Sequence, residues 1–127
     1  FKGLTKAYGA WIQLHPEKVR LMEVTLEEPG KIDFEAFSLS WAPVLHSPES
    51  LAYRIQDAAG KVIVYSGDTD ACESLKDLAK NADLLICESA LPDAMKLPGH
   101  LTPSLACGIA AGWFLLSSLT AVLSRLP

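Results

Sequence analysis

The sequence predicts a mixed α/β fold of the α+β kind, in which a mostly antiparallel sheet carries its helices on one face. Two apolar patterns and one change of period lead to this prediction. Apolar side chains at Phe37, Leu39 and Trp41 alternate with small ones, as in a strand with one buried face. Leu84–Cys87 is a short continuous apolar run, typical of a strand buried on both faces. Over residues 71–82 the apolar positions recur at helical spacing instead.

Length, composition and charge limit the class of protein. With 127 residues, 50% of them hydrophobic and 20% charged, the chain is long enough for one globular domain. The 15 acidic and 11 basic residues give a formal net charge of −4, which predicts no basic face for duplex nucleic acid. No signal peptide is recognisable, and the cysteine count is odd, so we predict reduced thiols and a cytoplasmic protein. These cysteines fall at apolar positions and are expected to fill core space: Cys72, Cys87 and Cys107.

The first half of the chain is predicted to hold one helix and four strands. An apolar stripe at helical spacing is followed by runs of branched or alternating apolar residues, and a glycine-containing turn separates the last two runs. The expected elements are a helix at Phe1–Ile12, strands at Val19–Leu26, Phe37–Trp41, Leu51–Gln56 and Lys61–Tyr65, and a hairpin turn at Asp57–Gly60.

The second half is predicted to place a helix on either side of the continuous apolar strand. Asp70 and Glu73 are spaced for a reciprocal cap at the start of the first helix, and Asn81 stands where that helix should end. The second helix is expected at Pro103–Ala111, with Thr102 as its cap and proline at its first position.

The end of the chain is harder to assign. No charged residue occurs between Thr102 and Ser124, which exceeds the roughly 18 residues at which an uncharged stretch becomes a candidate membrane span. A proline, glycines and serines interrupt the stretch, so a buried helix followed by a buried strand fits it as well. Residues 112–127 are therefore left as strand, helix or membrane tail, and a membrane contact through 103–124 stays an alternative.

Four side chains are candidates for a functional site. Asp68 and Glu88 each follow a predicted strand, and open sheets bind ligands beyond the carboxyl ends of their strands. His46 also follows a strand, where a neutral imidazole suits metal ligation, and His100 is the nearest imidazole that Glu88 could orient. Plainer interpretations stand beside these: a helix cap for Asp68, a strand end in solvent for Glu88, and ordinary loop positions for both histidines.

Five short segments occur in one order along the chain: His46-Ser47, Tyr53-Arg54-Ile55, Tyr65-Ser66-Gly67-Asp68-Thr69, Cys87-Glu88-Ser89-Ala90 and Gly99-His100-Leu101-Thr102. Together they resemble the C-terminal half of metallo-β-lactamase-fold hydrolases, in particular the branch that includes the tRNA-processing endonuclease RNase Z. The resemblance runs from Val19 to Ala111. It implies a partial αββα sandwich, with residues 1–127 as one partial domain and 112–127 as a divergent ending.

The resemblance also implies a metal centre. His46 would be a terminal ligand and Asp68 a carboxylate bridging two Zn²⁺ ions, with Mn²⁺ as an alternative metal. His100, held by Glu88, would stabilise the transition state or protonate the leaving oxygen. The implied substrates are small-molecule esters or phosphodiesters, or RNA.

The chain departs from this family in three places. Cys87 stands where the branch usually has a histidine, the His-x-His-x-Asp-His cluster does not occur in the 127 residues, and Gly112–Pro127 contains no histidine. Because zinc sites need three or four protein ligands, we expect a fragment of a zinc-dependent hydrolase with little or no hydrolysis by the isolated chain. An apolar sheet face left without its other half would favour a homodimer or aggregation.

Two other interpretations remain open. The chain could be a non-catalytic or vestigial binding module of the same fold, with no metal centre. Alternatively, the Gly67-Asp68-Thr69-Asp70 segment could belong to a Mg²⁺-dependent phosphatase of the haloacid-dehalogenase type. That chemistry needs an Asp-x-Asp nucleophile at an early strand end, for which Asp33-Phe34-Glu35 is a poor substitute.

Overall fold

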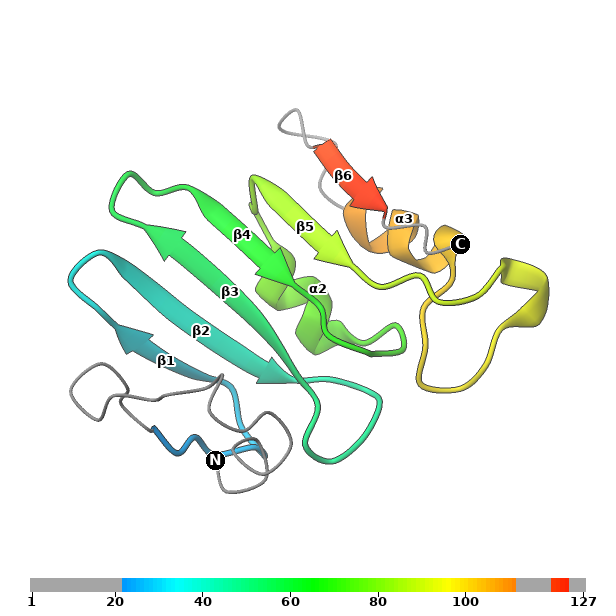
Figure 1. The fold of residues 1–127 in the computed structure, drawn as a ribbon, viewed down its shortest axis with the longest axis horizontal. Coiled ribbons are helices and arrows are strands. Elements are labelled where there is room, and N and C mark those ends of the chain that lie inside the picture. The colour runs from blue at the N-terminus through cyan, green and yellow to red at the C-terminus, as the bar shows by residue number, and fades with distance from the viewer. Residues whose placement is uncertain (1–21, 112–119, 124–127) are drawn as a thin grey trace, which may run out of the picture.

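The computed structural model describes residues 22–111 and 120–123, and within them the chain forms one six-stranded sheet (Figure 1). The strands follow one another across the sheet in chain order, antiparallel from β1 to β4 and parallel from β4 to β6. Their bounds are β1 Gly30–Asp33, β2 Phe37–Pro43, β3 Leu51–Asp57, β4 Val62–Tyr65, β5 Leu84–Cys87 and β6 Thr120–Leu123.

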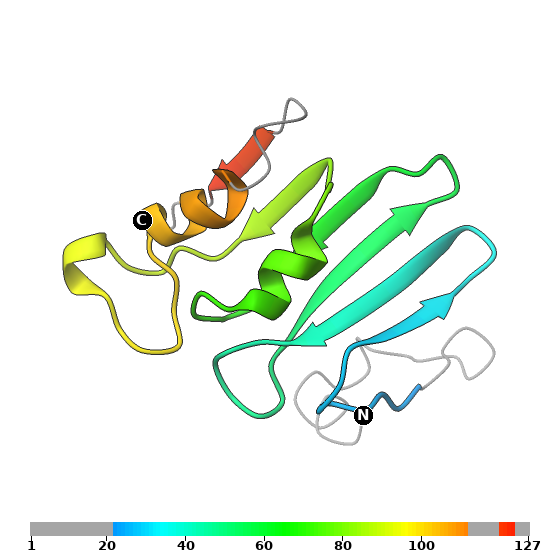
Figure 2. The same ribbon diagram turned by 180° about the vertical axis from the view of Figure 1, so that it is seen from behind.

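Two helices cover one face of this sheet (Figure 2). They are α2 Glu73–Ala79 and α3 Pro103–Ala111, and a short 3-10 turn, η3 Asp93–Met95, lies in the loop before α3. The core between helices and sheet is built from fully buried residues of both layers, among them Val64, Leu75 and Leu101. The predicted α+β class with helices on one face is confirmed for the part of the chain that the structure describes.

The hairpin between β3 and β4 has the predicted turn. The backbone N–H of Gly60 donates to the carbonyl of Asp57 at 3.0 Å, and Gly60 has φ +83°, a conformation that glycine adopts without strain. The carboxylate of Asp57 accepts from the amides of Ala59 and Lys61, so the turn is closed by its own side chain.

The predicted strand at Val19–Leu26 is wrong where it can be checked. Residues 22–26 lie in no strand, and the edge strand is instead β1, which the apolar pattern did not indicate. The indole N–H of Trp41 donates to the Thr25 carbonyl at 3.2 Å, so this carbonyl accepts a hydrogen bond from a side chain and not from a neighbouring strand. Gly30 permits this packing, because a Cβ there would overlap the Trp41 ring.

The predicted reciprocal cap of α2 is also wrong. The cap residue is Cys72, without a side-chain hydrogen bond, and Glu73 pairs with Lys76 at 2.6 Å. The carboxylate of Asp70 has other partners, which are described with the candidate site. Asn81 does follow the helix in the left-handed region, with φ +56°, as its position predicted.

Near the C-terminus, β6 pairs with β5 in parallel, so the strand interpretation holds for residues 120–123. The rest of 112–127 and the predicted helix Phe1–Ile12 lie outside the described residues. In the described part, neither helix has the length and apolar character needed to cross a membrane.

The prediction that all three cysteines fill core space is partly wrong. Cys87 is buried at 4% exposure and Cys72 is half-buried, but Cys107 lies on the exposed side of α3. All three are free thiols. Helical spacing alone placed Cys107 near the apolar stripe, whereas Ala106, Ile109 and Ala110 are the positions of α3 that face the core.

This difference predicts unequal thiol reactivity. Burial raises the pKa of the Cys87 thiol to about 11, so little nucleophilic thiolate exists there at neutral pH. We expect iodoacetamide at pH 7.5 to alkylate Cys107 well before Cys87, and the Cys87 rate to rise as pH approaches 11. Peptide mapping by mass spectrometry measures both rates, and the urea-unfolded chain is the control in which they converge. Equal rates in the folded chain would contradict the prediction.

The other face of the sheet exposes apolar side chains. Pairing aligns Tyr53 with Tyr65 and Ile86 in one row, and Ile55 with Ile63 in the next. All five are at least 36% exposed. We call these five residues the open sheet face. Its presence confirms the expected apolar surface.

Candidate metal and catalytic site

The candidate residues lie along one edge of the sheet, and the strand directions explain why. β2 and β4 each run antiparallel to β3, and β5 runs parallel to β4, so β2, β4 and β5 all end at the same edge. The loops that follow these strands carry His46, Asp68 and Glu88 respectively, and His100 lies in the loop before α3. Residues more than fifty positions apart thereby share one edge.

Glu88 and His100 are in contact. The Nδ1 atom of His100 lies 3.3 Å from the Glu88 carboxylate, and the side chains are 29% and 11% exposed. The same carboxylate accepts the backbone N–H of Thr69 at 2.6 Å. Glu88 is therefore not a strand end that has merely reached solvent, because its carboxylate joins the loop after β4 to the imidazole.

A buried hydroxyl fixes the position of Glu88. Ser66, the first residue after β4, is fully buried, and its Oγ accepts the backbone N–H of Glu88 at 3.0 Å and donates to the Gly67 carbonyl at 2.7 Å. Gly67 has φ +60°, and a Cβ there would lie 2.9 Å from the Leu51 carbonyl oxygen, so only glycine fits. The Ser-Gly pair thus builds the turn that brings Asp68 and Thr69 to the edge.

His46 lies beside His100. The two ring centroids are 5.0 Å apart in an edge-to-face arrangement. The Nδ1 atom of His46 lies 3.3 Å from the Ser50 hydroxyl, and the side chain is exposed. The structure therefore brings together three of the four predicted site residues by direct contact: His46, Glu88 and His100.

Asp68 occupies the same edge without joining this contact network. Its side chain is exposed, and none of the hydrogen bonds or ion pairs seen among residues 22–111 involves it. It does not cap α2, because the cap residue is Cys72. The interpretation of Asp68 as a helix cap is therefore wrong, and its oxygens stay accessible at the sheet edge.

Zinc binds imidazole nitrogens and carboxylate oxygens in proteins. His46 offers the first type of donor and Asp68 offers the second. Within the described residues, however, no three His, Cys, Asp or Glu side chains gather closely enough to hold a metal ion. The residues described here do not form a complete zinc site by themselves.

The phosphatase alternative does not match the topology. Asp33 ends β1, which runs antiparallel to β2, so this carboxylate lies at the opposite edge from Asp68. It pairs with Lys31 at 2.7 Å on the surface. A nucleophile at Asp33 could not act together with a cation held near Asp68.

Two features of the structure were missed in the sequence. Lys96, in the loop after η3, pairs with Asp70 at 2.6 Å, and this hydrogen bond lowers the pKa of the Asp70 carboxyl. Nothing in the spacing of Asp70 and Lys96 signals a pair, because they meet only when the loops fold over the sheet edge.

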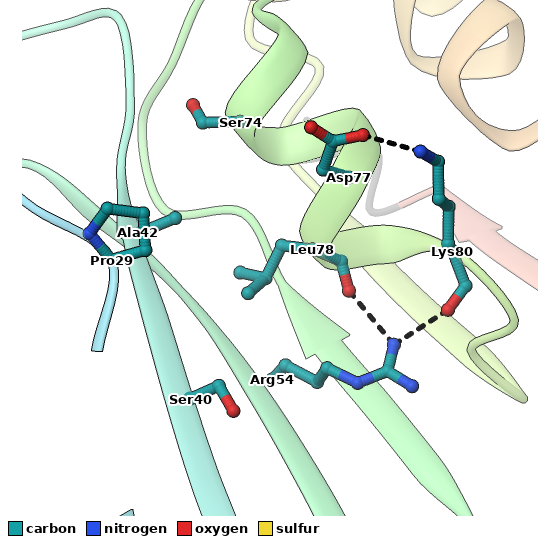
Figure 3. Close-up of a pocket in the computed structure, with 8 residues that line it drawn as sticks. All are labelled: Pro29, Ser40, Ala42, Arg54, Ser74, Asp77, Leu78 and Lys80. Atoms are coloured by element: carbon teal, nitrogen blue, oxygen red, sulfur yellow. Dashed lines mark hydrogen bonds and ion pairs between the residues drawn. The ribbon is translucent and has the colours of Figure 1, made fainter. Parts of the chain in front are cut away.

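The second feature is a pocket of about 630 Å³ on the helical face, between β2, β3 and α2 (Figure 3). Arg54 reaches across it and donates from Nη1 to the carbonyls of Leu78 and Lys80 at 2.9 and 2.8 Å. Burial lowers the pKa of Arg54. Arg54 thus binds the carbonyls at the end of α2. This structural contact accounts for the arginine of the Tyr53-Arg54-Ile55 segment, and among the described residues Arg54 makes no hydrogen bond to a candidate site residue.

Comparison with known proteins agrees with the fold. Residues 4–113 match the family model described as "Beta-lactamase superfamily domain", and the chain belongs to this family. Its structure is similar to human tRNase Z, short form (ELAC1), with a TM-score of 0.62 and 28% identity over 74% of this chain and 38% of that chain. It is also similar to the metallo-β-lactamase fold protein YhfI from Bacillus subtilis, with a TM-score of 0.60 and 26% identity over 71% and 37% of the two chains.

The chain is also similar to several curated proteins. The chain is 39% identical over 70 residues to the uncharacterized protein Rv1339 of Mycobacterium tuberculosis, covering 54% of this chain and 26% of that protein. It is 38% identical over 63 residues to Ribonuclease Z 1 of Schizosaccharomyces pombe, covering 50% and 8%. It is 32% identical over 98 residues to the zinc phosphodiesterase ELAC protein 2 of Rattus norvegicus, covering 74% and 11%. The chain spans about a quarter or less of the length of these relatives.

Proposed function

We propose that this chain supplies part of the active site of a zinc-dependent phosphodiesterase of the RNase Z type. The observation that carries the proposal is the contact of Glu88 with His100 beside His46, at the edge where Asp68 also lies. The zinc phosphodiesterase and ribonuclease Z names among the relatives support the same chemistry.

In this proposal His46 and Asp68 contribute two ligands of a two-zinc centre, and the remaining ligands come from outside the described residues. Bound zinc would supply a hydroxide nucleophile at neutral pH and would neutralise charge on the phosphodiester. The Nδ1–H of His100 donates a hydrogen bond to the Glu88 carboxylate, which fixes the ring so that Nε2 is presented to a substrate oxygen. The amide of Thr69 donates to Oε1 of this carboxylate and holds it in place.

The substrate class is a phosphodiester, with RNA as the first candidate because two relatives are named for RNase Z or tRNase Z. A small-molecule phosphodiester is the second candidate. The formal net charge of −4 favours it, because a net acidic chain gives no general attraction to a polyanion.

A zinc titration and a chimera test the proposal together. Zn²⁺ added to the isolated chain should shift the NMR signals of His46 and Asp68 weakly and give no hydrolysis of bis(p-nitrophenyl) phosphate. Residues 22–111 placed into human tRNase Z, short form, at the matching region should restore zinc binding and hydrolysis. Within that chimera His100→Ala should lower kcat by roughly 100-fold, the lower range for a lost general acid.

The control in the same chimera is Glu73→Ala, which removes an exposed α2 glutamate that the proposal does not use and should leave kcat unchanged. A folded chimera that binds no zinc would contradict the proposal and favour the non-catalytic module. A folded chimera that binds zinc and loses no activity in His100→Ala would contradict the role of His100.

We further propose that the 127-residue chain self-associates through the open sheet face. Size-exclusion chromatography with light scattering should give a mass above that of a monomer. Ile63→Glu should reduce this mass, because it places a charge on β4, the middle one of the three strands that form the face. Met95→Glu, an equally apolar exposed residue in η3, is the control and should change nothing. A monomeric wild-type chain would contradict this prediction.

A further inference from the structure

Asp70 lies between the two loops that carry the histidines of the candidate site. Its backbone N–H donates to the Leu45 carbonyl at 2.8 Å, in an isolated antiparallel bridge. The Leu45 N–H in turn donates to the Thr69 hydroxyl at 3.2 Å. Since Leu45 directly precedes His46, the main chain of Asp70 is fixed against the first histidine loop.

The side chain of Asp70 binds the second histidine loop. Its Oδ2 accepts the ammonium of Lys96 at 2.6 Å and the backbone N–H of Gly99 at 3.2 Å, while Oδ1 accepts the N–H of Ala71 at 2.8 Å. The side chain is only 20% exposed, and hydrogen bonds to an ionised carboxylate are stronger than neutral ones. Gly99 directly precedes His100, so this carboxylate is tied to the loop of the second histidine.

The position of Gly99 matters because it packs directly against His46. Gly99 has φ +82°, and a Cβ added there would lie 3.3 Å from Cδ2 of the His46 ring. The glycine therefore allows the loop before α3 to approach the imidazole closely. Because Gly99 contacts His46 and directly precedes His100, its position bears on the separation of the two histidine rings, whose centroids are 5.0 Å apart.

We propose that Asp70 is a positioning residue that sets the separation and mutual orientation of His46 and His100. It acts through Leu45 on one loop and through Gly99 and Lys96 on the other, and it touches neither ring itself. Its importance for catalysis rests on the proposed function. The geometric role does not, because it concerns only contacts within this chain.

The test compares Asp70→Ala with Asp77→Ala in the 127-residue chain. Asp77 also pairs with a lysine at 2.6 Å, but on α2, so its removal deletes an ion pair of the same length without touching either loop. In wild type and Asp77→Ala we expect a nuclear Overhauser effect between ring protons of His46 and His100. In Asp70→Ala we expect that effect to be lost. Asp70→Asn, whose amide oxygen can still accept the Gly99 N–H, should retain it.

An unchanged effect in Asp70→Ala overturns the proposal, and so does an equal loss in Asp77→Ala. If Asp70→Ala does not fold, the hydrogen exchange rate of the Gly99 amide is measured in Lys96→Met instead. Faster exchange than in wild type supports the positioning role of Asp70, and an unchanged rate overturns it. Neither measurement needs zinc or substrate. A failed zinc or hydrolysis experiment therefore counts against the proposed function alone. A failed nuclear Overhauser or amide-exchange experiment counts against the positioning role of Asp70 alone.

Discussion

Replacing Glu88 by alanine should lower the free energy of unfolding by about 2 kcal/mol, because the Thr69 amide loses its partner inside the protein. Thr69 is fully buried, so water cannot readily replace the carboxylate. The same change releases the His100 imidazole, which is held by this carboxylate at 3.3 Å. Urea denaturation followed by circular dichroism measures the loss of stability, and line shapes of the His100 ring protons report its freedom.

Two variants separate the contributions of Glu88. Glu88→Gln keeps an oxygen for the Thr69 amide and should retain most of the stability, while losing the negative charge beside His100. Glu73→Ala removes a solvent-exposed glutamate that pairs with Lys76 and should cost less than about 0.5 kcal/mol. If Glu88→Ala were as stable as Glu73→Ala, the hydrogen bond to Thr69 would have no energetic importance.

Replacing Leu101 by alanine should destabilise the chain by about 3 kcal/mol, because a fully buried side chain leaves a cavity in the core. Leu101 directly follows His100 and belongs to the same buried core cluster as Ala106 and Ile109 of α3. It therefore anchors the histidine loop to the helical layer. A shift of the urea midpoint at unchanged slope measures the effect.

Leu97→Ala is the matched control, since it makes the same substitution in the same loop at a side chain that is 54% exposed. Only the backbone carbonyl of Leu97 is used, by Lys96 and by the His100 N–H, and it survives the substitution. We expect a change below about 0.5 kcal/mol. Similar losses in the two variants would show that Leu101 is not part of the core.

The two predictions bear on the same question, which is how a loop without regular structure holds a histidine in place. Glu88 binds the imidazole from the sheet edge, and Leu101 fixes the backbone one residue further along. Loops that carry functional groups need such attachment to a rigid scaffold. In this chain the scaffold is the sheet edge, and each attachment comes from a residue next to a strand or helix.

Much of the candidate site could be predicted from sequence. Asp68 and Glu88 were indicated because each follows an apolar run that forms a strand, and parallel strands end at one edge. The contact between Glu88 and His100 was expected and is present. The roles of these residues in metal binding and catalysis stay predictions.

Other contacts could not be predicted, because they depend on how loops fold over the sheet edge. Asp70 was expected to cap α2 and instead binds Lys96 and Gly99, which lie 26 and 29 positions away. Local spacing can suggest that Asp70 caps the helix. It cannot show that a lysine from another loop lies close enough to form a stronger, charged hydrogen bond with the same carboxylate. The packing of Trp41 could not be predicted either, because its indole N–H donates to the Thr25 carbonyl, which lies 16 positions away in a segment predicted to be a strand.

The sequence by itself determined the elements that short-range periodicity encodes. It determined α3 to the residue, the strands around the Asp57–Gly60 turn, and the helix that ends before Asn81. The physical reason is that apolar spacing and turn residues act over a few neighbours. Only the tertiary structure decided that His46 meets His100 and that Asp70 joins their loops. Those contacts depend on strand order and loop packing between residues far apart in the sequence, which local patterns do not encode.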